Sequence, residues 1–433
     1  MLSKEHSDLI TLTGPATKGG ELLRRYWQPV ALSAELEADV PLPVKIMGED
    51  LALFRDDHGT PALIGRHCPH RGVDLSYGRV EDGGLRCLYH GWLISSGGRC
   101  LEQPGEPAGS TFKDKVRHVA YPCFEAGGLV MTYMGPGQPP RRPALPCFNA
   151  SPERVWTTKI HHDCNYLQGN EGNIDPQHLS YLHRFIDPRA DPVGINALLV
   201  ADPSPKIEVE ETAYGLRIFT TRAVGGGKSY IRITNFIMPN LSAFEGAPLV
   251  NPQGPRMKDN IGYQMHWHMP IDDVTHWKYT LLYAHAEPID KAFIEKFVFC
   301  DVTEDYTLPG NRRNRYLQDR EEMKRTSFAG MGPSFWAHDK FATESQRPIA
   351  DRSREHLGTT DRPTIMMRRQ LLQAIEDVAA GRDPLLVERD GQPDALAEME
   401  VVSKEMPSTT DPRGDWWRQH APRRKRAAQL VGE

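Results

Sequence analysis

Two short segments each place one cysteine and one histidine where both could bind the same metal. Cys68 is followed two residues later by His70, and Cys87 three residues later by His90, with sixteen residues between the two segments. Thiolate and imidazole groups are strong ligands for transition metals, and four of them presented from two loops complete a four-ligand site. The spacing therefore predicts a metal centre built from Cys68, His70, Cys87 and His90.

Three interpretations of this pattern compete. Zinc sites also use two cysteines and two histidines, but zinc fingers usually place the cysteine pair first and the histidine pair second. One cysteine and one histidine from each segment fit a Rieske [2Fe–2S] cluster, in which one iron takes two cysteines and the other two histidines. Gly72 and Gly91, which follow the two histidines, allow tight loops that bring backbone N–H groups near the sulfides. The cluster is favoured, and zinc and accidental spacing are the alternatives.

A second group of possible ligands lies further along the chain. On a helix, Asp175 and His178 would be neighbours on one face, whereas His183 is more than one turn beyond His178, so an irregularity or a helix end is expected between them. Two histidines and a carboxylate form the facial triad that binds Fe(II) and leaves positions open for O₂. Alone, the histidine pair would be better explained by a surface or core position. Beside the cluster segments, a ligand role is preferred.

The first group resembles a known family motif. Cys68-Pro-His-Arg-Gly and Cys87-Leu-Tyr-His-Gly-Trp are similar to the cluster motif of the Rieske non-heme iron oxygenases. Respiratory Rieske proteins carry an extra cysteine beside each loop, where this chain has Val73 and Tyr89. The resemblance extends over nearly the whole chain, which is therefore identified as an oxygenase (α) component.

The second group resembles the iron-site motif Asp-x2-His-x4-His of the same family, and residues 170–175 are typical of its phthalate-dioxygenase-like branch. The resemblance implies that His178 and His183 bind iron. It also implies that Asp175 carries electron transfer, by hydrogen bonds that link an iron-bound histidine to a cluster histidine of the neighbouring subunit. The third iron ligand of the family is a later aspartate, for which Asp339 is the choice here, and His338 replaces the more usual glutamine before it.

The resemblance also implies cofactors and partners. We expect one Rieske [2Fe–2S] cluster and one mononuclear non-heme Fe(II) per chain, with O₂ as co-substrate. No Gly-x-Gly-x2-Gly unit follows a strand, so NAD(P)H is expected to act only through a separate reductase of the flavin and ferredoxin type, with or without a separate ferredoxin. A homotrimer is expected, because the two centres of one chain should lie far apart and each cluster would then reduce the neighbour's iron. A pure electron-transfer Rieske carrier and a zinc-stabilised binding module are the alternatives, and the iron-site segment counts against the carrier.

The substrate class implied by the branch is an aromatic acid. We favour oxidative O-demethylation of a methoxylated, lignin-derived acid, from overall resemblance, and cis-dihydroxylation of phthalate or a related aromatic acid is the alternative. Arg217, Arg222 and Arg232 lie in strands after the iron-site segment, where an arginine facing the cavity would bind a carboxylate. A solvent-facing salt bridge is the favoured explanation for each of the three.

The pattern of apolar residues predicts the elements that must position these groups. Residues 40–146 contain short apolar runs broken by Gly, Pro and Asp, typical of a compact all-β unit, and the Pro-rich residues 135–143 read as a linker. Beyond them we expect a helical stretch over 164–183. Strands are expected over 214–221, 230–237 and 276–285, and helices over 20–27 and 363–380. The buried stripe expected on the last helix is Ile365, Met366, Leu371, Leu372, Ile375 and Val378.

These elements sum to an α+β fold. An N-terminal all-β Rieske domain would precede a helix-grip catalytic domain, an antiparallel sheet with a long helix. The predicted limits are 1–39 for an N-terminal helical segment that packs on the catalytic domain, 40–146 for the Rieske [2Fe–2S] domain and 147–433 for the catalytic domain.

Composition excludes several other classes of protein. The 433 residues include 52 Lys and Arg and 57 Asp and Glu, a net charge of −5, which argues against nucleic acid as a partner. No apolar run approaches the length of a membrane span, and the first residues lack the layout of a signal peptide, so a cytoplasmic protein is expected. Seven cysteines are too few and too irregular for a disulfide framework.

Some weaker signals receive structural explanations. His266 and His268 alternate on one strand face, where a packing or surface role is favoured over one in the substrate pocket. The run Gly227-Lys-Ser lacks the remaining glycine of a phosphate-binding loop and fits a β-hairpin. The cysteines outside the cluster segments are interpreted as small, buried, apolar residues: Cys100, Cys123, Cys147, Cys164 and Cys300.

Overall fold

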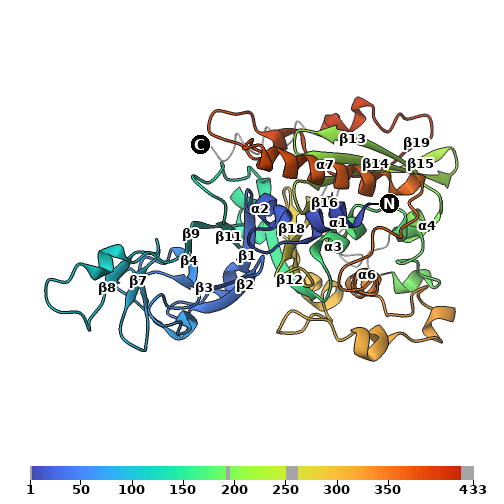
Figure 1. The fold of residues 1–433 in the computed structure, drawn as a ribbon. Coiled ribbons are helices and arrows are strands. Elements are labelled where there is room, and N and C mark those ends of the chain that lie inside the picture. The colour runs from blue at the N-terminus through green and yellow to red at the C-terminus, as the bar shows by residue number, and fades with distance from the viewer. Residues whose placement is uncertain (1, 192–195, 250–261, 421–433) are drawn as a thin grey trace.

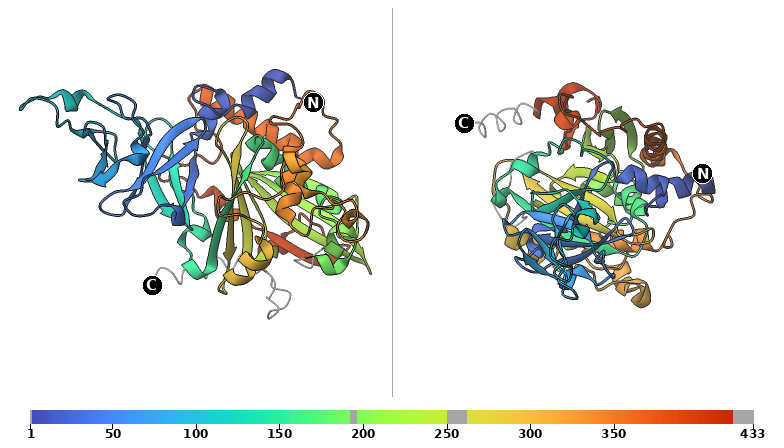
Figure 2. Two further views of the ribbon diagram at one scale, coloured as in Figure 1. Left: turned by 90° about the horizontal axis from the view of Figure 1, so that it is seen from below. Right: turned by 60° about the vertical axis from the view of Figure 1, so that its left-hand side comes forward.

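The structure is a computed structural model that describes residues 2–191, 196–249 and 262–420. Figure 1 shows a smaller β-rich lobe on one side and a larger lobe of sheet and helices on the other. The left view of Figure 2 shows the smaller lobe projecting from one end of the larger one. The β-rich part comes first along the chain and the α+β part second, in the order that the sequence predicts.

Three antiparallel sheets make up the smaller lobe and its junction with the larger one. Their strand orders are β2-β3-β4-β9, β5-β6-β7-β8 and β1-β11-β10. Phe54 and Ile64 of the first sheet pack with Leu85 and Ile94 of the second in a separate core. The strands are β1 (Trp27–Leu32), β2 (Leu42–Ile46), β3 (Glu49–Arg55), β4 (Pro61–Gly65), β5 (Arg79–Glu81), β6 (Gly84–Arg86), β7 (Leu93–Ser95), β8 (Cys100–Glu102), β9 (Ala120–Tyr121), β10 (Cys123–Ala126) and β11 (Leu129–Tyr133).

The larger lobe is built on an eight-stranded antiparallel sheet. Its order is β12-β18-β17-β16-β15-β14-β13, and β19 pairs with β15. β14 and β15 are joined by a hairpin in which Gly225, Gly226 and Gly227 have φ values of 84°, 59° and 70°, a conformation that favours glycine. The strands are β12 (Val155–His162), β13 (Lys206–Thr212), β14 (Gly215–Gly225), β15 (Lys228–Ile237), β16 (Leu241–Glu245), β17 (Gly262–Pro270), β18 (His276–Ala284) and β19 (Val402–Pro407).

The long helix α7 (Arg362–Ala379) packs against β13 and β14 (Figure 1). Pro363 lies in its first turn, and Gly381, at φ 72°, follows its end, as predicted. The predicted buried stripe is partly wrong, because Ile365 is exposed and Arg368 is buried instead. The other helices are α1 (Lys4–Thr11), α2 (Lys18–Leu23), α3 (Tyr166–Asn173), α4 (Asn196–Val200), α5 (Lys291–Phe293) and α6 (Phe335–Glu344).

Two predicted helices are shorter than expected. The one expected over 20–27 is α2, and Trp27 instead begins β1. The stretch expected over 164–183 is α3 followed by a short 3₁₀ turn, His178–Ser180, so the expected irregularity is present. None of the described helices is long and apolar enough to cross a membrane.

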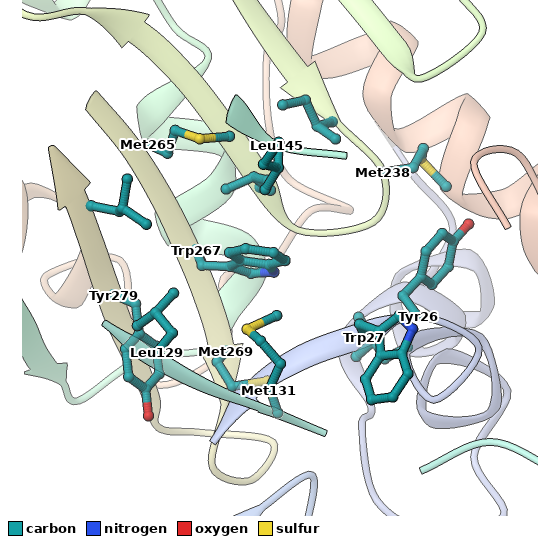
Figure 3. Packing of buried hydrophobic residues seen from close by; sticks show 14 of the residues in the cluster. Tyr26, Trp27, Leu129, Met131, Leu145, Met238, Met265, Trp267, Met269 and Tyr279 are labelled. Carbon is teal, nitrogen blue, oxygen red and sulfur yellow. The ribbon is translucent and has the colours of Figure 1, made fainter. Parts of the chain in front are cut away.

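The main core is continuous from the junction sheet into the larger lobe. Trp27 of β1 and Met131 of β11 belong to the same buried cluster as Trp267 and Met269 of β17, and Figure 3 shows Met131 close to Met269 and below Trp267. Because a shared core must be broken before its parts can separate, β1, β10 and β11 hold the smaller lobe firmly to the catalytic sheet.

Candidate metal centres

The two cluster segments form matching turns in the smaller lobe, one after β4 and the other after β6. In the first, the N–H of Cys68 donates to the carbonyl of Val73 (2.8 Å) and the N–H of Gly72 donates back to Cys68 (2.8 Å). In the second, the N–H of Cys87 donates to the carbonyl of Trp92 (2.9 Å) and the N–H of Gly91 donates back to Cys87 (3.0 Å). Both glycines have positive φ, 75° and 74°, so each turn needs the freedom of glycine.

The four predicted ligands divide by burial. Cys68 and Cys87 are each 3% exposed, whereas His70 and His90 lie at the surface with their ring centroids 4.6 Å apart. Trp92 stacks on His70 at 4.6 Å and fixes the plane of that ring. Burial, together with the neighbouring Cys87 thiol, raises the pKa of Cys68 to about 11. Two buried sulfurs beneath two surface imidazoles fit a group that needs thiolates on one iron and imidazoles on the other.

The second predicted site is also assembled. One ligand atom each from His178, His183 and Asp339 lie within 4.8 Å of one another. Oδ1 of Asp339 is 3.0 Å from Nε2 of His183 and 3.9 Å from Nε2 of His178. His178 comes from the 3₁₀ turn after α3, and Asp339 from α6, whose N-terminus Ser334 caps. Two imidazole nitrogens facing one carboxylate oxygen fit a divalent iron with open positions.

Two neighbours orient the carboxylate and one histidine. Nζ of Lys278, a side chain buried in β18, lies 3.2 Å from Oδ2 of Asp339 and so leaves Oδ1 to face the histidines. Although burial opposes its ionisation, Lys278 holds the pKa of Asp339 well below its usual range. His338 lies 3.3 Å from His183 between the two Nδ1 atoms, and its Nε2 lies 3.0 Å from the carbonyl of Gly332.

His338 therefore has a defined task. Its Nε2 must carry a proton, because it donates a hydrogen bond to the carbonyl of Gly332. Burial lowers the pKa of His338 to about 4, so the ring is neutral. Its Nδ1 therefore has a lone pair that accepts from Nδ1–H of His183. That bond leaves the lone pair of His183 on Nε2, toward Asp339. Such outer contacts fix the tautomer of a metal-binding histidine.

Asp175 lies on the opposite side of the His178 ring from the ligand atoms. Its Oδ2 is 3.7 Å from Nδ1 of His178, an ion-pair distance but too long for a hydrogen bond, and its Oδ1 accepts the N–H of Gln177 (2.7 Å). The side chain keeps 29% of its surface exposed. Asp175 thus connects the His178 ring with the protein surface.

A cavity of about 290 Å³ opens beside the three ligands. Much of its wall is aliphatic or aromatic, as expected for an apolar ligand. Arg232 and Glu245 form an ion pair in the wall, with two contacts of 2.8 Å to Nη2. The lining residues used below are Asn173, Arg232, Glu245, Gln264 and His266.

Several minor sequence predictions need correction. Arg217, Arg222 and Arg232 are all buried rather than solvent-facing, because cross-strand neighbours and carbonyls surround them, and of the three only Arg232 is among the described cavity lining. His266 also lines the cavity, whereas His268 lies behind it. Cys300 is exposed and lies at the cavity, not in the core.

Comparisons with known proteins identify the two lobes. Residues 26–122 match the model described as the Rieske [2Fe-2S] domain, and residues 132–429 match the model described as LigXa C-terminal domain like. The phthalate 4,5-dioxygenase oxygenase subunit of Pseudomonas putida is 34% identical over 429 residues, 94% of each chain. This chain belongs to the Rieske non-heme iron oxygenases, as an oxygenase (α) component.

Other relatives of this Rieske oxygenase differ in their named reactions. The 5,5'-dehydrodivanillate O-demethylase oxygenase subunit of Sphingobium sp. (strain NBRC 103272 / SYK-6) is 33% identical over 410 residues, 90% of this chain and 84% of the relative. The crystal structure of dicamba monooxygenase bound to dicamba shares the fold, with a TM-score of 0.58 and 20% identity over 83% of this chain and 99% of that one.

The comparisons confirm the predicted family, fold class, enzyme class and pair of cofactors, a Rieske [2Fe–2S] cluster and a mononuclear iron with electrons from a reductase. At 33–34% identity, a relative named as a dioxygenase and one named as an O-demethylase are almost equally similar to this chain. The roles of individual residues and the domain limits 1–39, 40–146 and 147–433 stay predictions. Sequence reasoning missed Lys278 and Glu245, for which the one available signal was a charged residue within an otherwise apolar strand.

Proposed function

We propose that this oxygenase O-demethylates a methoxylated aromatic acid. In that reaction the methyl ether, O₂, two electrons and two protons yield a phenol, formaldehyde and water. The bond between the methoxy carbon and its oxygen breaks, the carbon is oxidised to formaldehyde and O₂ is reduced.

Within this proposal each predicted site residue has one role. Cys68, His70, Cys87 and His90 bind the cluster. The iron is bound by a set of three, His178, His183 and Asp339. The bound iron supplies the activation of O₂, with electrons that a reductase delivers through the cluster. The protein's own part is to fix the ligand geometry, through Lys278 and His338, and to hold the substrate in the adjoining cavity.

The choice of an acid as the substrate depends on Arg232. This arginine is 6% exposed in the cavity wall, and its Nε–H has no acceptor among the described residues, while Nη2 is held by Glu245. A buried guanidinium N–H without an acceptor is costly unless a ligand accepts a hydrogen bond from it, and a carboxylate is the strongest acceptor available. One such group on an apolar ring would fill this part of the cavity.

The same wall is less suited to a dianion. Arg232 is the one Lys or Arg side chain in the described lining, and Glu245 already offsets its charge. A phthalate-like substrate would bring a second carboxylate into an apolar wall without a partner, which costs free energy. Dihydroxylation of phthalate or a related acid is the second candidate because the phthalate 4,5-dioxygenase subunit is as similar as the O-demethylase subunit.

The proposal includes a homotrimer with electron transfer through Asp175 from one subunit to the next. Figure 1 shows β7 and β8, beside the cluster turns, at one end of the molecule and α3 and α6 in the other half. Leu88 and Tyr89, next to His90, are 60% and 53% exposed, and Tyr181 and Phe328 near the iron ligands are 47% and 45% exposed. Apolar side chains at both centres support a contact between copies that brings the centres together.

The partners follow from the same chemistry. A flavin and ferredoxin type of reductase, directly or through a separate ferredoxin, would supply the electrons. The structure describes all seven cysteines and joins none of them in a disulfide, which supports the reducing cytoplasm as the proposed location.

A single-turnover assay tests the proposed reaction. Chemically reduced, iron-replete enzyme is mixed with O₂ and a panel of methoxylated benzoates and phthalates, and products are read by mass and by formaldehyde release. Formaldehyde with the matching phenol is the expected result. A product that gains two hydroxyl groups without formaldehyde would establish the dihydroxylase instead.

A further inference from the structure

Five side chains form a hydrogen-bonded chain that runs from behind the sheet to the cavity. Nδ1 of His276 lies 2.7 Å from the carbonyl of Cys164, and Nε2 of His276 lies 3.0 Å from Nδ1 of His268. Nε2 of His268 lies 2.7 Å from Nδ2 of Asn173. The same Nδ2 lies 3.1 Å from Nδ1 of His266, whose Nε2 lies 3.2 Å from Oε1 of Gln264.

The backbone carbonyl at one end fixes the direction of the whole chain. A carbonyl oxygen only accepts, so Nδ1 of His276 must carry a proton. Burial lowers the pKa of His276 to about 3 and that of His268 well below its usual range, so both rings are neutral. Nε2 of His276 is then a lone pair that accepts from Nδ1–H of His268. In turn, Nε2 of His268 is a lone pair that accepts from Asn173.

The orientation of the Asn173 amide follows from these tautomers. Its NH₂ group must face the two histidines, because an oxygen there would meet the lone pair of His268. Oγ of Ser242 lies 3.1 Å from the same Nδ2 and shares the second N–H with His266, because the amide has only two hydrogens to donate. The cavity end of the chain agrees with this orientation of Asn173. Nδ1 of His266 accepts from the Asn173 amide, and Nε2–H of His266 donates to Gln264.

The space for this chain is provided by helix α3. A Cβ atom on Gly169 would lie 2.2 Å from Nδ1 of His268 and 2.9 Å from Nε2 of His276. Only glycine at this position lets the helix approach the histidine pair and place Asn173, one turn later, against His268. The helix that ends just before Asp175 is therefore also the element that sets this amide.

Asn173 lines the cavity beside the ligands, and its Oδ1 accepts no hydrogen bond from the described residues. We propose that Asn173 is a specificity-determining residue whose carbonyl oxygen accepts a hydrogen bond from a hydroxyl group on the substrate ring. This inference rests on the proposed function and narrows its substrate to a methoxylated aromatic acid that also carries a free phenol. An acceptor that cannot rotate discriminates against an ether or a second carboxylate at the same place, since neither has a proton to donate.

Equilibrium binding tests the inference independently of turnover. We would titrate anaerobic, iron-replete enzyme with 4-hydroxy-3-methoxybenzoate, with 3-methoxybenzoate, which lacks the hydroxyl, and with 3,4-dimethoxybenzoate, which blocks it, and with the positional isomers of each set. Wild-type enzyme is expected to bind a hydroxyl-bearing member at least about tenfold more tightly than both partners of its set.

Two variants locate the cause of that preference. Asn173→Ala removes the acceptor and is expected to bring the ratio of the two affinities, with and without the hydroxyl group, near one. The main cause should be weaker binding of the hydroxyl-bearing ligand. His276→Leu lies outside the cavity and removes the proton donor to Cys164, so His268 can change tautomer and Asn173 can rotate. It is expected to lower the ratio as well, while iron content and the circular dichroism spectrum stay as in the wild type.

The outcomes separate this inference from the proposed reaction. A wild-type ratio near one in every set, or a preference that survives in Asn173→Ala, overturns the role of Asn173 even when formaldehyde is formed. A preference lost in Asn173→Ala supports the role, and if formaldehyde is then absent in single turnover, only the demethylation proposal fails. Failure of every hydroxyl-bearing acid to bind overturns both.

Discussion

Replacing Glu171 by glutamine should destabilise the catalytic lobe strongly. Glu171 lies in α3, and its two oxygens accept from Nε and Nη2 of Arg352 at 2.9 and 2.7 Å. Oε1 also accepts from Nε of Arg368 on α7 at 2.7 Å, and Arg368 reaches Glu355 as well. The exposed fractions are 12% for Glu171, 0% for Arg352 and 4% for Arg368.

The expected loss of stability follows from the contacts that the two arginines keep in the variant. Without the carboxylate, Arg368 keeps Glu355, but Arg352 keeps no ionised partner, only the glutamine oxygen and a 3.4 Å contact to the carbonyl of Ala350. Removing one partner of a buried ion pair leaves an uncompensated charge and costs about 3–5 kcal/mol. Because Glu171 connects α3 to α7 and to the segment after α6, the loss of stability is expected in the lobe that carries the predicted iron ligands.

Urea unfolding measures this cost. Far-UV circular dichroism follows the protein as a whole and the visible spectrum of the cluster follows the smaller lobe, since a two-lobed protein with cofactors need not unfold in one step. The matched control is Asp383→Asn. Asp383 also pairs with an arginine through two contacts, 3.0 and 2.8 Å to Arg389, but the two side chains are 40% and 37% exposed. An exposed pair of this kind contributes about 1 kcal/mol or less.

The reasoning is refuted if Glu171→Gln changes the free energy of unfolding by less than about 1 kcal/mol, or by no more than the control. Acid provides a second check. Burial opposes ionisation, but the two arginines outweigh it and hold the pKa of Glu171 below its usual range. The stabilisation that ionised Glu171 provides is therefore complete above the pKa of an unfolded glutamate, about 4.3. It is lost as the pH falls through the lower pKa of Glu171 in the folded protein. The difference in the free energy of unfolding between wild type and Glu171→Gln should therefore shrink as the pH falls.

Three further predictions address the metal centres and the histidine chain. Asp175→Asn should keep both metals, by iron analysis and visible spectrum, but lose nearly all O₂-coupled turnover; normal turnover with intact metals contradicts the bridging role. His70→Ala should lose the visible [2Fe–2S] spectrum while far-UV circular dichroism shows a folded catalytic lobe, and a retained spectrum would exclude His70 as a ligand. Because the pKa of His276 is about 3 when folded and about 6.5 when unfolded, protonation favours the unfolded chain as pH falls below 6.5. Wild type should lose about 1 kcal/mol from this group between pH 7 and 5.5, and urea unfolding of His276→Asn should show a smaller loss.

The sequence was most informative where the chemistry is local. Each cluster turn is complete within a few residues, from Cys68 to Val73 and from Cys87 to Trp92, so spacing alone could predict both. Asp339 lies far from His183 in the chain, and only the family resemblance could select it. The structure places it 3.0 Å away.

The errors come from contacts that no local pattern records. The helix stripe assigned to α7 put Ile365 inside because it is apolar, but the ion pairs of Arg368 with Glu171 and Glu355 turn that side of the helix inward. Arg232 was expected at the surface because isolated charged residues usually are, whereas Glu245 on the neighbouring strand stabilises it in the cavity wall. Both depend on partners supplied by distant parts of the chain.

The shared core of β1, β10, β11 and the catalytic sheet has a consequence for kinetics. A lobe held in this way cannot swing on a hinge toward the iron site of its own chain. In the proposed transfer between subunits, reduction of the iron would therefore depend on meeting another copy of the chain. Turnover per chain should then follow mass action and fall when the enzyme is diluted below the concentration at which copies associate. A mixture of chains that each lack one centre should regain activity only through mixed assemblies, in proportion to how often a complete pair of centres forms by chance.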